Sequence, residues 1–386
     1  MSPVRQVEAA PLGTPSIHVE IAPLPSLEEL APVWQDLETR ADRSFFLSWS
    51  WIGTWLATID CRPDLITARH GGDVVGLGLV LARLKRRHRL LPIWTLFLHQ
   101  TGDEDQDVVT IEYNDFLIDR RFRDQVRSVC LRALVDHGEI AGRHVGEVVL
   151  GGVDANLREP IEALGRPVQE RAATGSAFVD LEALRGTGKP FLESLKPTSA
   201  RRIRRSMTLY EKRGALALRA AGDVDEALDF FEKCGALHQA RWTTRGRPGA
   251  FAFPFYVAFH RRLIQAALPL GKVELLEVSA GGEPIGYLYN FLDRGRALYY
   301  LSGFRFEADN RLKPGLVCHS LAIERHRDGG MNVYDFMGGD QRYKLELGQA
   351  GPAIVHLAIQ LPNWMLAAER PLRRLKQAIE SVRPRR

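Results

Sequence analysis

The sequence is poor in cysteine and has no apolar run long enough to cross a bilayer. Its four cysteines are far apart and form no CxxC or Cys/His spacing, which argues against a disulfide scaffold and a structural zinc site. The longest apolar stretches, Val74–Ala82 and Leu90–Leu98, are each about half of the ~20 residues in a membrane helix. Residues 1–15 lack the apolar segment of a secretory signal. We therefore expect a cytoplasmic protein without a bound metal, peripheral to the inner membrane at most.

No charge of one sign dominates the chain, but its basic residues are clustered. The net charge is +5, from 52 Lys and Arg against 47 Asp and Glu in 386 residues. Three segments are strongly basic: Arg83–Arg89, Lys196–Arg213 and Glu369–Arg386. This distribution favours local contacts with anionic groups over a surface that coats nucleic acid, so we expect no DNA partner. A charge run is also the ordinary composition of a solvated face.

An internal repeat indicates two copies of one mixed α/β unit. Apolar residues make up 45% of the chain, an ordinary value for a globular protein long enough for two domains. Gly71–Gly76 is similar to Gly281–Gly286, each a hairpin turn entering an apolar strand, and Val148–Gly152 is similar to Asp335–Gly339. The predicted domains are 15–170 and 180–365, followed by a basic C-terminal helix or tail over 366–386. Two coincidental glycine turns are the alternative explanation.

Local signals predict the elements of each copy. A serine N-cap predicts a helix over 26–40, and apolar patterning predicts strands over 65–70, 74–84, 89–99 and 111–118. In the second copy, proline at the first helical position predicts helices over 254–267 and 314–328. A terminal helix is predicted over 361–382.

Two segments of the second copy carry residues suited to chemistry. Lys313-Pro314-Gly315-Leu316 begins a helix whose free N–H groups and positive dipole end form a natural phosphate site, although a Pro-Gly start is also an ordinary structural cap. Tyr334–Lys344 then places carboxylates, phenols, a guanidinium and an ammonium at a strand end, where α/β proteins bind ligands. A surface turn with Asp340 paired to Arg342 is the plainer interpretation of that segment.

These motifs, taken in order, resemble a known family. They are Ala200–Arg205, Leu237–Trp242, Gly249–Phe251, Gly282–Gly286, Tyr299–Phe304, Pro314–Gly315 and Tyr334–Lys344. As a set they resemble the GNAT-fold acyltransferase domain of the CelD/BcsL type, found in bacterial exopolysaccharide clusters, and more distantly the Fem-type aminoacyltransferases. The resemblance implies an α/β fold of tandem GNAT-like units, each a mixed, largely antiparallel sheet flanked by helices.

The resemblance also implies acyl transfer from a CoA thioester, with acetyl-CoA as co-substrate, to an amine. The helix start would hold the CoA diphosphate and the preceding strand would donate N–H groups to the thioester oxygen. The implied donor-binding residues are Leu301, Ser302, Gly303, Phe304, Lys313, Pro314, Gly315, Leu316 and Val317. The first copy has Asp119–Arg123 at the corresponding helix start, with neither proline nor glycine, so we expect it to have lost CoA binding and to shape the acceptor cleft.

The reaction needs a base, because an ammonium is mostly protonated at neutral pH. The carboxylates of Asp335 and Asp340 are the first candidates and His238 is the third. Lys344 resembles a lysine that stabilises charge or holds a phosphate in the Fem-type enzymes, and Tyr343 is a further catalytic candidate. His238 is equally well explained as an ordinary helix residue.

Basic residues near these candidates suit an anionic acceptor. Arg241, Trp242 and Arg245 begin a basic, glycine-rich loop able to clamp a sugar nucleotide or a lipid diphosphate, and Arg204 lies on a basic helix that would guide anions. Trp242 is as readily explained by packing.

The favoured function is therefore an N-acyltransferase acting on a small-molecule or lipid-linked amino sugar in exopolysaccharide synthesis. Arg311–Leu316 departs from the Q/R-x-x-G-x-G/A loop of many GNAT enzymes, which leaves a Fem-like aminoacyltransferase acting on a cell-wall precursor as an alternative. A non-catalytic module that senses a nucleotide is a third. The basic C-terminal segment would contact anionic lipid or a cyclic dinucleotide, or form a solvated helix end.

Overall fold

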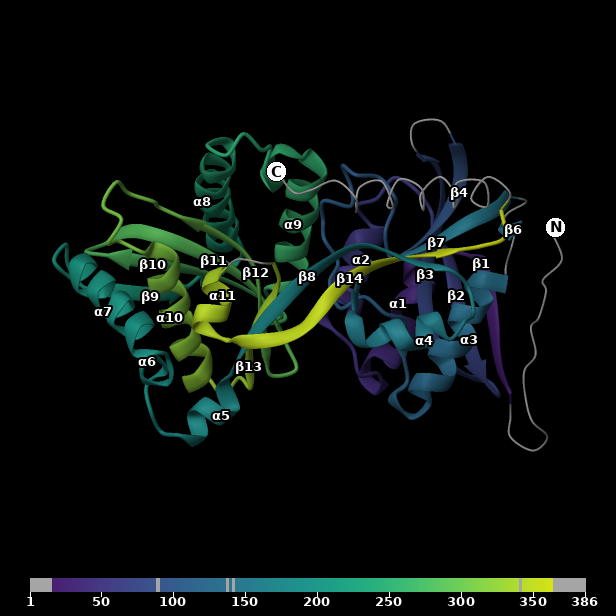
Figure 1. Ribbon diagram of the computed structural model, residues 1–386, viewed down its shortest axis with the longest axis horizontal. Helices are drawn as coiled ribbons and strands as arrows, with labels where there is room; N and C mark the ends of the chain where they lie inside the picture. Colours follow the sequence, from purple (N-terminus) through teal and green to yellow (C-terminus); the bar gives the residue numbers. More distant parts are fainter. Residues whose placement is uncertain (1–15, 88–90, 137–138, 141–142, 340–341, 364–386) are drawn as a thin grey trace, which may run out of the picture. The chain divides into compact units, whose positions relative to one another are not determined.

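The computed structural model describes residues 16–87, 91–136, 139–140, 143–339 and 342–363 (Figure 1). The chain forms two compact units. Of the described residues, unit 1 comprises those within 16–47, 59–173 and 355–363, and unit 2 comprises those within 48–58 and 174–354. Two long strands, β8 (Val168–Asp180) and β14 (Gln349–Gln360), contribute residues to both units. The predicted C-terminal segment 366–386, and the predicted terminal helix beyond residue 363, lie outside the described residues.

Unit 1 is a mostly antiparallel sheet with strand order β1-β2-β3-β4-β7-β14-β8. Its main elements are β1 (Ile17–Pro23), α1 (Leu27–Arg40), β2 (Asp64–His70), β3 (Asp73–Arg87), β4 (Leu91–Leu98), β5 (Leu117–Ile118), α3 (Arg123–Asp136), β7 (Arg143–Asp154) and α4 (Arg158–Glu162). The predicted helix after Ser26 is confirmed by a capping box in which the Ser26 side chain and Glu29 satisfy each other's backbone N–H groups.

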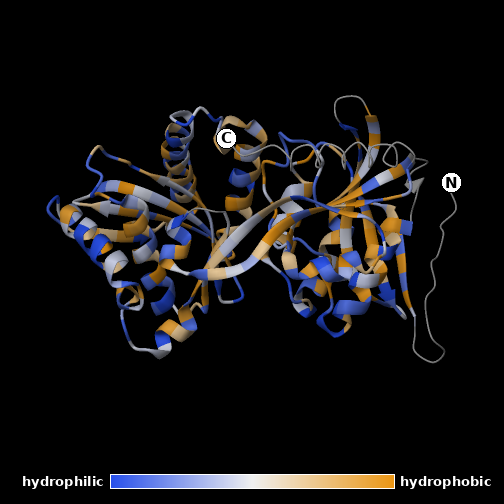
Figure 2. Ribbon diagram, in the orientation of Figure 1, coloured by the Kyte–Doolittle hydropathy of each residue, from blue (hydrophilic) through white to orange (hydrophobic). Residues whose placement is uncertain are grey.

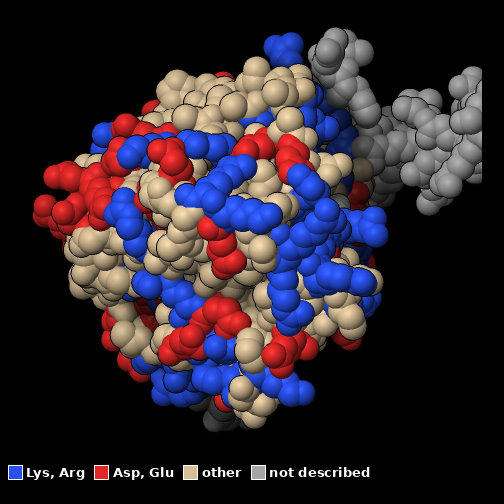
Figure 3. All heavy atoms as spheres, turned by 90° about the vertical axis from the view of Figure 1, so that its left-hand side faces the viewer, with Lys and Arg blue, Asp and Glu red and all other residues tan. Residues whose placement is uncertain are grey.

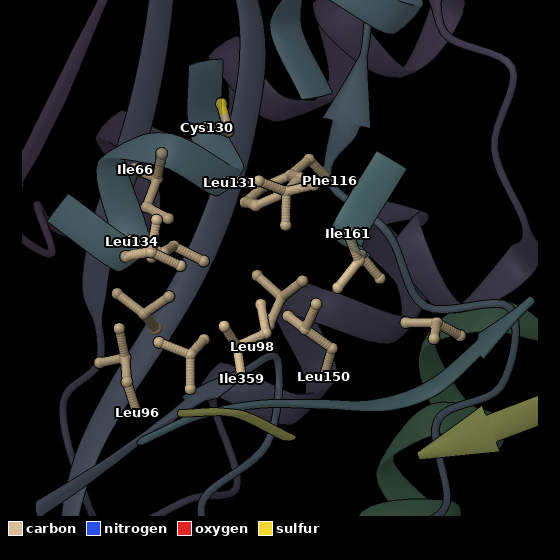
Figure 4. Close-up of a cluster of buried hydrophobic side chains, with 14 of the residues drawn as sticks. Ile66, Leu96, Leu98, Phe116, Cys130, Leu131, Leu134, Leu150, Ile161 and Ile359 are labelled. Carbon is tan, nitrogen blue, oxygen red and sulfur yellow. The ribbon is translucent and has the colours of Figure 1, made fainter. Parts of the chain in front are cut away.

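The core of unit 1 joins strands from distant parts of the chain. Side chains of β2, β4 and β7 pack on Cys130, Leu131 and Leu134 of α3, and Ile359 of β14 completes the cluster (Figure 4). The predicted strand over 111–118 is wrong for most of its length, because only Leu117–Ile118 pairs, with β3. Residues before it are held instead by the Asn114 side chain, which donates to the Leu98 and Gly151 carbonyls.

Unit 2 repeats this plan with strand order β14-β8-β13-β12-β11-β10-β9. Its elements are α2 (Trp49–Leu56), α5 (Leu181–Gly186), α6 (Phe191–Ser194), α7 (Pro197–Glu211), β9 (Leu216–Ala220), α8 (Val224–Thr243), α9 (Pro254–Ala267), β10 (Val273–Ala280), β11 (Glu283–Asp293), β12 (Arg296–Phe304), α10 (Pro314–Asp328), β13 (Val333–Gly338) and α11 (Arg342–Leu347). The predicted helices over 254–267 and 314–328 are confirmed.

Helices cover both faces of the unit 2 sheet. Apolar residues of α5, α6, α7 and α10 form one core with β10 to β13, while α8 packs on the opposite face against β11 and β12, with α9 and α2 beside it (Figure 1). Figure 2 shows many of the strands coloured as hydrophobic. The hairpins β2-β3 and β10-β11 turn at the repeated glycine pairs, and Gly71 and Gly281 both have the positive φ (61°) that favours glycine. In each unit the antiparallel strands are followed by a helix and then by a strand that pairs in parallel with the last of them. These parallel pairs are β4 with β7 in unit 1 and β12 with β13 in unit 2.

No helix in the described part of the chain is long and apolar enough to cross a membrane. Within the same residues, no three His, Cys, Asp or Glu side chains are grouped closely enough to hold a metal ion.

Candidate functional site

The strands β12 and β13 of unit 2 diverge soon after they begin. They pair in parallel only over Arg296–Leu298 and Val333–Asp335. On its other edge β12 pairs with β11, where Tyr289 faces Leu301 and Asn290 faces Tyr299, so Tyr300 forms a bulge. Beyond the bulge, the edge of β12 toward β13 has no ladder partner among the described residues. The predicted donor-binding residues Leu301, Ser302, Gly303 and Phe304 all lie in this segment.

The helix α10 begins shortly after β12 and presents an uncapped N-terminus. Its N-cap residue Lys313 makes no side-chain cap hydrogen bond, and Pro314 occupies the first helical turn. The Lys313 N–H donates to the buried Ser206 Oγ of α7 at 2.8 Å, which fixes the start of the helix. A Cβ added to Gly315 would lie 3.1 Å from the Phe304 ring, so glycine allows the strand end to pack over the helix. The free N–H groups of the first turn suit a diphosphate.

The corresponding helix start in unit 1 already holds an anion of its own. Asp119 accepts from the backbone N–H of Arg121 at 3.0 Å, and its carboxylate also pairs with the guanidiniums of Arg121 and Arg40. These bonds, with that from Arg121 the strongest, hold the pKa of Asp119 far below its usual range. A second anion at this helix start would meet a fixed negative charge.

The strands of unit 1 also stay together where those of unit 2 diverge. β4 and β7 remain paired as far as Phe97 and Val149. Beyond that point the Asn114 amide bridges the carbonyls of Leu98 and Gly151, at 3.0 Å and 2.9 Å. Its oxygen lies 2.9 Å from Nδ1 of the buried His99. In unit 1 the carbonyls at these strand ends are therefore hydrogen-bonded to a side chain of the same unit. The corresponding edge of β12 in unit 2 has no ladder partner among the described residues.

His238 of α8 lies against the diverging segment of β12. Its Nδ1 donates to the Ser302 carbonyl at 3.2 Å, which leaves the lone pair on Nε2. Burial lowers the pKa of His238, so the ring is neutral at neutral pH. The helix and the strand are closely packed here, because a Cβ on Gly303 would lie 2.9 Å from the Cys234 carbonyl carbon. The arrangement suits a general base.

The other predicted catalytic residues surround the end of β13. Asp335 is buried, accepts the Met337 N–H at 2.7 Å and pairs with Arg296 at 2.7 Å. Lys344 of α11 is only 4% exposed, and its ammonium donates to the Phe336 carbonyl at 2.8 Å and to the Gly338 carbonyl. Asp340 lies outside the described residues.

A buried imidazole that the sequence analysis did not single out lies beside Tyr343. His319 of α10 is fully buried, with Nδ1 3.0 Å from the Tyr334 hydroxyl and its ring stacked on Tyr343. Burial, reinforced by the Lys344 charge, lowers the pKa of His319 to about 3. Tyr343 hydrogen-bonds Tyr299, whose hydroxyl lies 2.6 Å from Ser302 Oγ. The only sequence signal for His319 is a polar residue within the buried run from Leu316 to Ile323.

The predicted substrate-binding residues occupy two places on unit 2. Arg241 and Arg245 are exposed at the end of α8, where Trp242 packs 5.9 Å from the His238 ring. Arg204 is exposed on α7, away from that helix end. Figure 3 shows Lys and Arg side chains gathered on the side of Figure 1 that carries α7, whose exposed arginines are Arg201, Arg202, Arg204 and Arg205.

Comparison with known proteins places a family match on unit 2. Residues 198–345 match the family described as Acetyltransferase (GNAT) domain. A search of curated protein sequences found no match. Similar solved structures include FemX (TM-score 0.58, 11% identity, covering 91% of this chain and 98% of that one). A second is the C-terminal domain of a putative lysylphosphatidylglycerol synthetase from Agrobacterium fabrum (TM-score 0.53, 13% identity, covering 87% of this chain and 93% of that one). A third is L-PGS from Bacillus licheniformis (TM-score 0.52, 12% identity, covering 89% of this chain and 94% of that one).

At these identities the structural likeness establishes the fold alone. The predicted class, a mixed α/β fold with GNAT-like units and a mostly antiparallel sheet flanked by helices, is confirmed. The domain match indicates an acyltransferase, a class whose GNAT domain generally uses an acyl-CoA. The CelD/BcsL type is not supported by these comparisons.

Proposed function

We propose that unit 2 is an N-acyltransferase that uses an acyl-CoA, with acetyl-CoA as the favoured donor. The observation that carries the proposal is the uncapped start of α10 directly after a strand that leaves its neighbour. The N–H groups of Gly315 and Leu316 and the Lys313 charge suit the diphosphate, and the open edge of Leu301–Phe304 suits the acyl carbonyl. The predicted donor-binding residue Val317 does not contribute its N–H, because that group already donates to the Lys313 carbonyl at 3.1 Å. Unit 1, with Asp119 at its helix start and its strands paired, does not bind the donor.

His238 acts as the base of this reaction. Its Nε2 takes a proton from the ammonium of the acceptor, and the free amine attacks the thioester carbonyl carbon. A C–N bond forms, the C–S bond breaks, and N–H groups of β12 stabilise the charge on the oxygen. Tyr343, whose pKa burial raises well above its usual value, remains protonated and donates a hydrogen bond to the leaving sulfur, and the thiolate takes up the second proton that the nitrogen loses as the amide forms. Coenzyme A supplies the activated acyl group when bound.

The remaining candidates hold the end of β13 in place. Asp335, through Arg296 and the Met337 N–H, and Lys344, through two strand carbonyls, act as positioning residues. Asp340 stays a predicted second base. The acceptor is an amino sugar, free or lipid-linked, of surface polysaccharide synthesis in the cytoplasm.

A second candidate function is aminoacyl transfer from tRNA. FemX, the domain of the putative lysylphosphatidylglycerol synthetase and L-PGS share the fold, and the exposed arginines of α7, next to the start of α10, suit a polyanionic donor. This function would use the same helix start and the same base.

Donor binding and thiol release separate these functions. Thermal unfolding is measured with CoA, desulfo-CoA and aminoacyl-tRNA, since a ligand that binds only the folded protein raises the Tm. Thiol release from acetyl-CoA is then measured for the wild type, His238→Gln and the exposed control His18→Gln. We expect His238→Gln to lower turnover by about 10²- to 10⁴-fold, the usual contribution of a positioned base, and to leave the CoA shift unchanged. A Tm shift with aminoacyl-tRNA alone would favour the second function, and binding without turnover on any amine would favour a sensor.

A further inference from the structure

We propose that Arg241, Arg245 and Arg247 bind a phosphate or diphosphate group carried by the amine substrate itself. This inference rests on the proposed function, because it names the class of acceptor that the same site takes. The three guanidiniums lie at the end of α8 and in the loop that follows it, and all three residues are exposed.

The charge of this segment is uncompensated. No Asp or Glu occurs between Glu232 and Glu274 in the sequence. None of the three arginines forms an ion pair within the described part of the chain, whereas nearby Arg213, Arg305 and Arg311 all pair with carboxylates. Arginine suits phosphate because its planar fork forms two parallel charge-assisted hydrogen bonds. The complementary ligand is therefore an anion.

The loop after α8 is held in one conformation by hydrogen bonds. The backbone N–H groups of Arg245 and Arg247 both donate to the Trp242 carbonyl, at 3.0 Å and 3.1 Å. The Gln239 amide donates to the Pro248 carbonyl at 2.6 Å and closes the turn. The guanidiniums of Arg245 and Arg247 lie 5.9 Å and 6.0 Å from the Trp242 ring centre. The cations are thus held around one aromatic ring.

The same ring connects the cations to the base. Trp242 packs on His238, with ring centres 5.9 Å apart, and both side chains come from adjacent turns of α8. Arg241 stacks on Phe306 at 4.4 Å, in the segment between β12 and α10. The guanidiniums would therefore lie about one or two sugar rings away from an amine that gives its proton to His238. A phosphate on that acceptor, as in a sugar phosphate or a lipid-linked sugar diphosphate, fits this arrangement.

Binding and turnover with matched amines test the inference. Glucosamine and glucosamine 1-phosphate differ only in the phosphate, and their affinities are measured by calorimetry for the wild type, the double variant R245A/R247A and the control R132A, which removes an exposed arginine of α3. We expect the wild type to prefer glucosamine 1-phosphate. We expect the double variant to lose about tenfold to a hundredfold of that affinity, as for lost charge-assisted bonds, while its affinity for glucosamine is unchanged. R245K/R247K should recover part of the preference, and R132A should keep all of it.

Three results would overturn the inference. They are an equal affinity of the wild type for the two amines, an equal loss for both amines in the double variant, and a loss of affinity for CoA that 3′-dephospho-CoA does not show. The last would assign the guanidiniums to the donor phosphate. Failure of the proposed function is a separate result, since it would appear as no thiol release with any amine, and the calorimetry would still decide whether the loop binds a phosphorylated amine.

Discussion

The close packing of α8 on β12 predicts that a single methyl group at Gly303 displaces the proposed base. In Gly303→Ala the added Cβ would come closest to the Cys234 carbonyl oxygen and would lie 2.9 Å from the carbonyl carbon and 3.0 Å from the Cα of Cys234, all backbone atoms of α8. Ordinary carbon–carbon contacts are about 3.5–4.0 Å and the carbonyl oxygen is closer than either carbon, so the helix and the strand must separate by roughly 1 Å or more. His238 would move with the helix, and its 3.2 Å hydrogen bond to Ser302 would lengthen beyond the usual range.

We expect this overpacking to cost about 1–3 kcal/mol of stability and, because the base is displaced, about a hundredfold in turnover. Urea unfolding and thiol release measure the two effects. Gly186→Ala in α5 is the matched control, since its added Cβ meets no atom within 4 Å and should cost nothing. Wild-type stability and turnover in Gly303→Ala would refute the reasoning, because the helix would then not be fixed against the strand.

The buried polar groups give two more predictions. The pKa of His319 is lowered to about 3, so below 6.5 the unfolded chain binds a proton that the folded chain does not, and stability falls as the pH falls. Between pH 8 and pH 5, wild type should lose about 2 kcal/mol more than His319→Phe in urea unfolding, and parallel curves would show that His319 titrates normally. Lys344→Met removes the donor to two strand carbonyls and should cost about 1–3 kcal/mol, whereas the exposed Lys212→Met should cost nothing measurable. Equal unfolding midpoints for the two lysine variants would contradict that assignment.

Elements with local signals were predictable from the sequence. The helices at Pro254 and Pro314 begin where proline sits at the first position, and the hairpins turn at their glycine pairs, because capping and turn preferences act within a few residues. The strand β8 had no such signal. Residues 170–173 are exposed, so the strand lacks the alternation of apolar and polar residues that a half-buried strand shows.

The candidate site was predictable in part, since its helix start and its strand end carry recognisable residue types. The partners of those residues were not. Asp335 pairs with Arg296, which is distant in the sequence, and with the N–H of Met337, whose positive φ (57°) arises only in the folded strand. His319 meets three tyrosines from two strands and another helix. Such contacts depend on tertiary packing, which residue patterns along one segment do not encode.

The interleaving of the chain has a consequence for biosynthesis. The core of unit 1 includes Val355, Leu357, Ile359 and Leu361, and unit 2 takes α2 from residues 48–58. The N-terminal copy therefore lacks part of its interior until residue 361 has left the ribosome, and the second copy needs a helix that was synthesised long before the rest of it. Both units therefore complete their cores only when the residues of β14 have been synthesised. A single cut between α2 and β14 would leave two fragments that each lack an interior piece, and co-expressed fragments should recover activity only by reassociating.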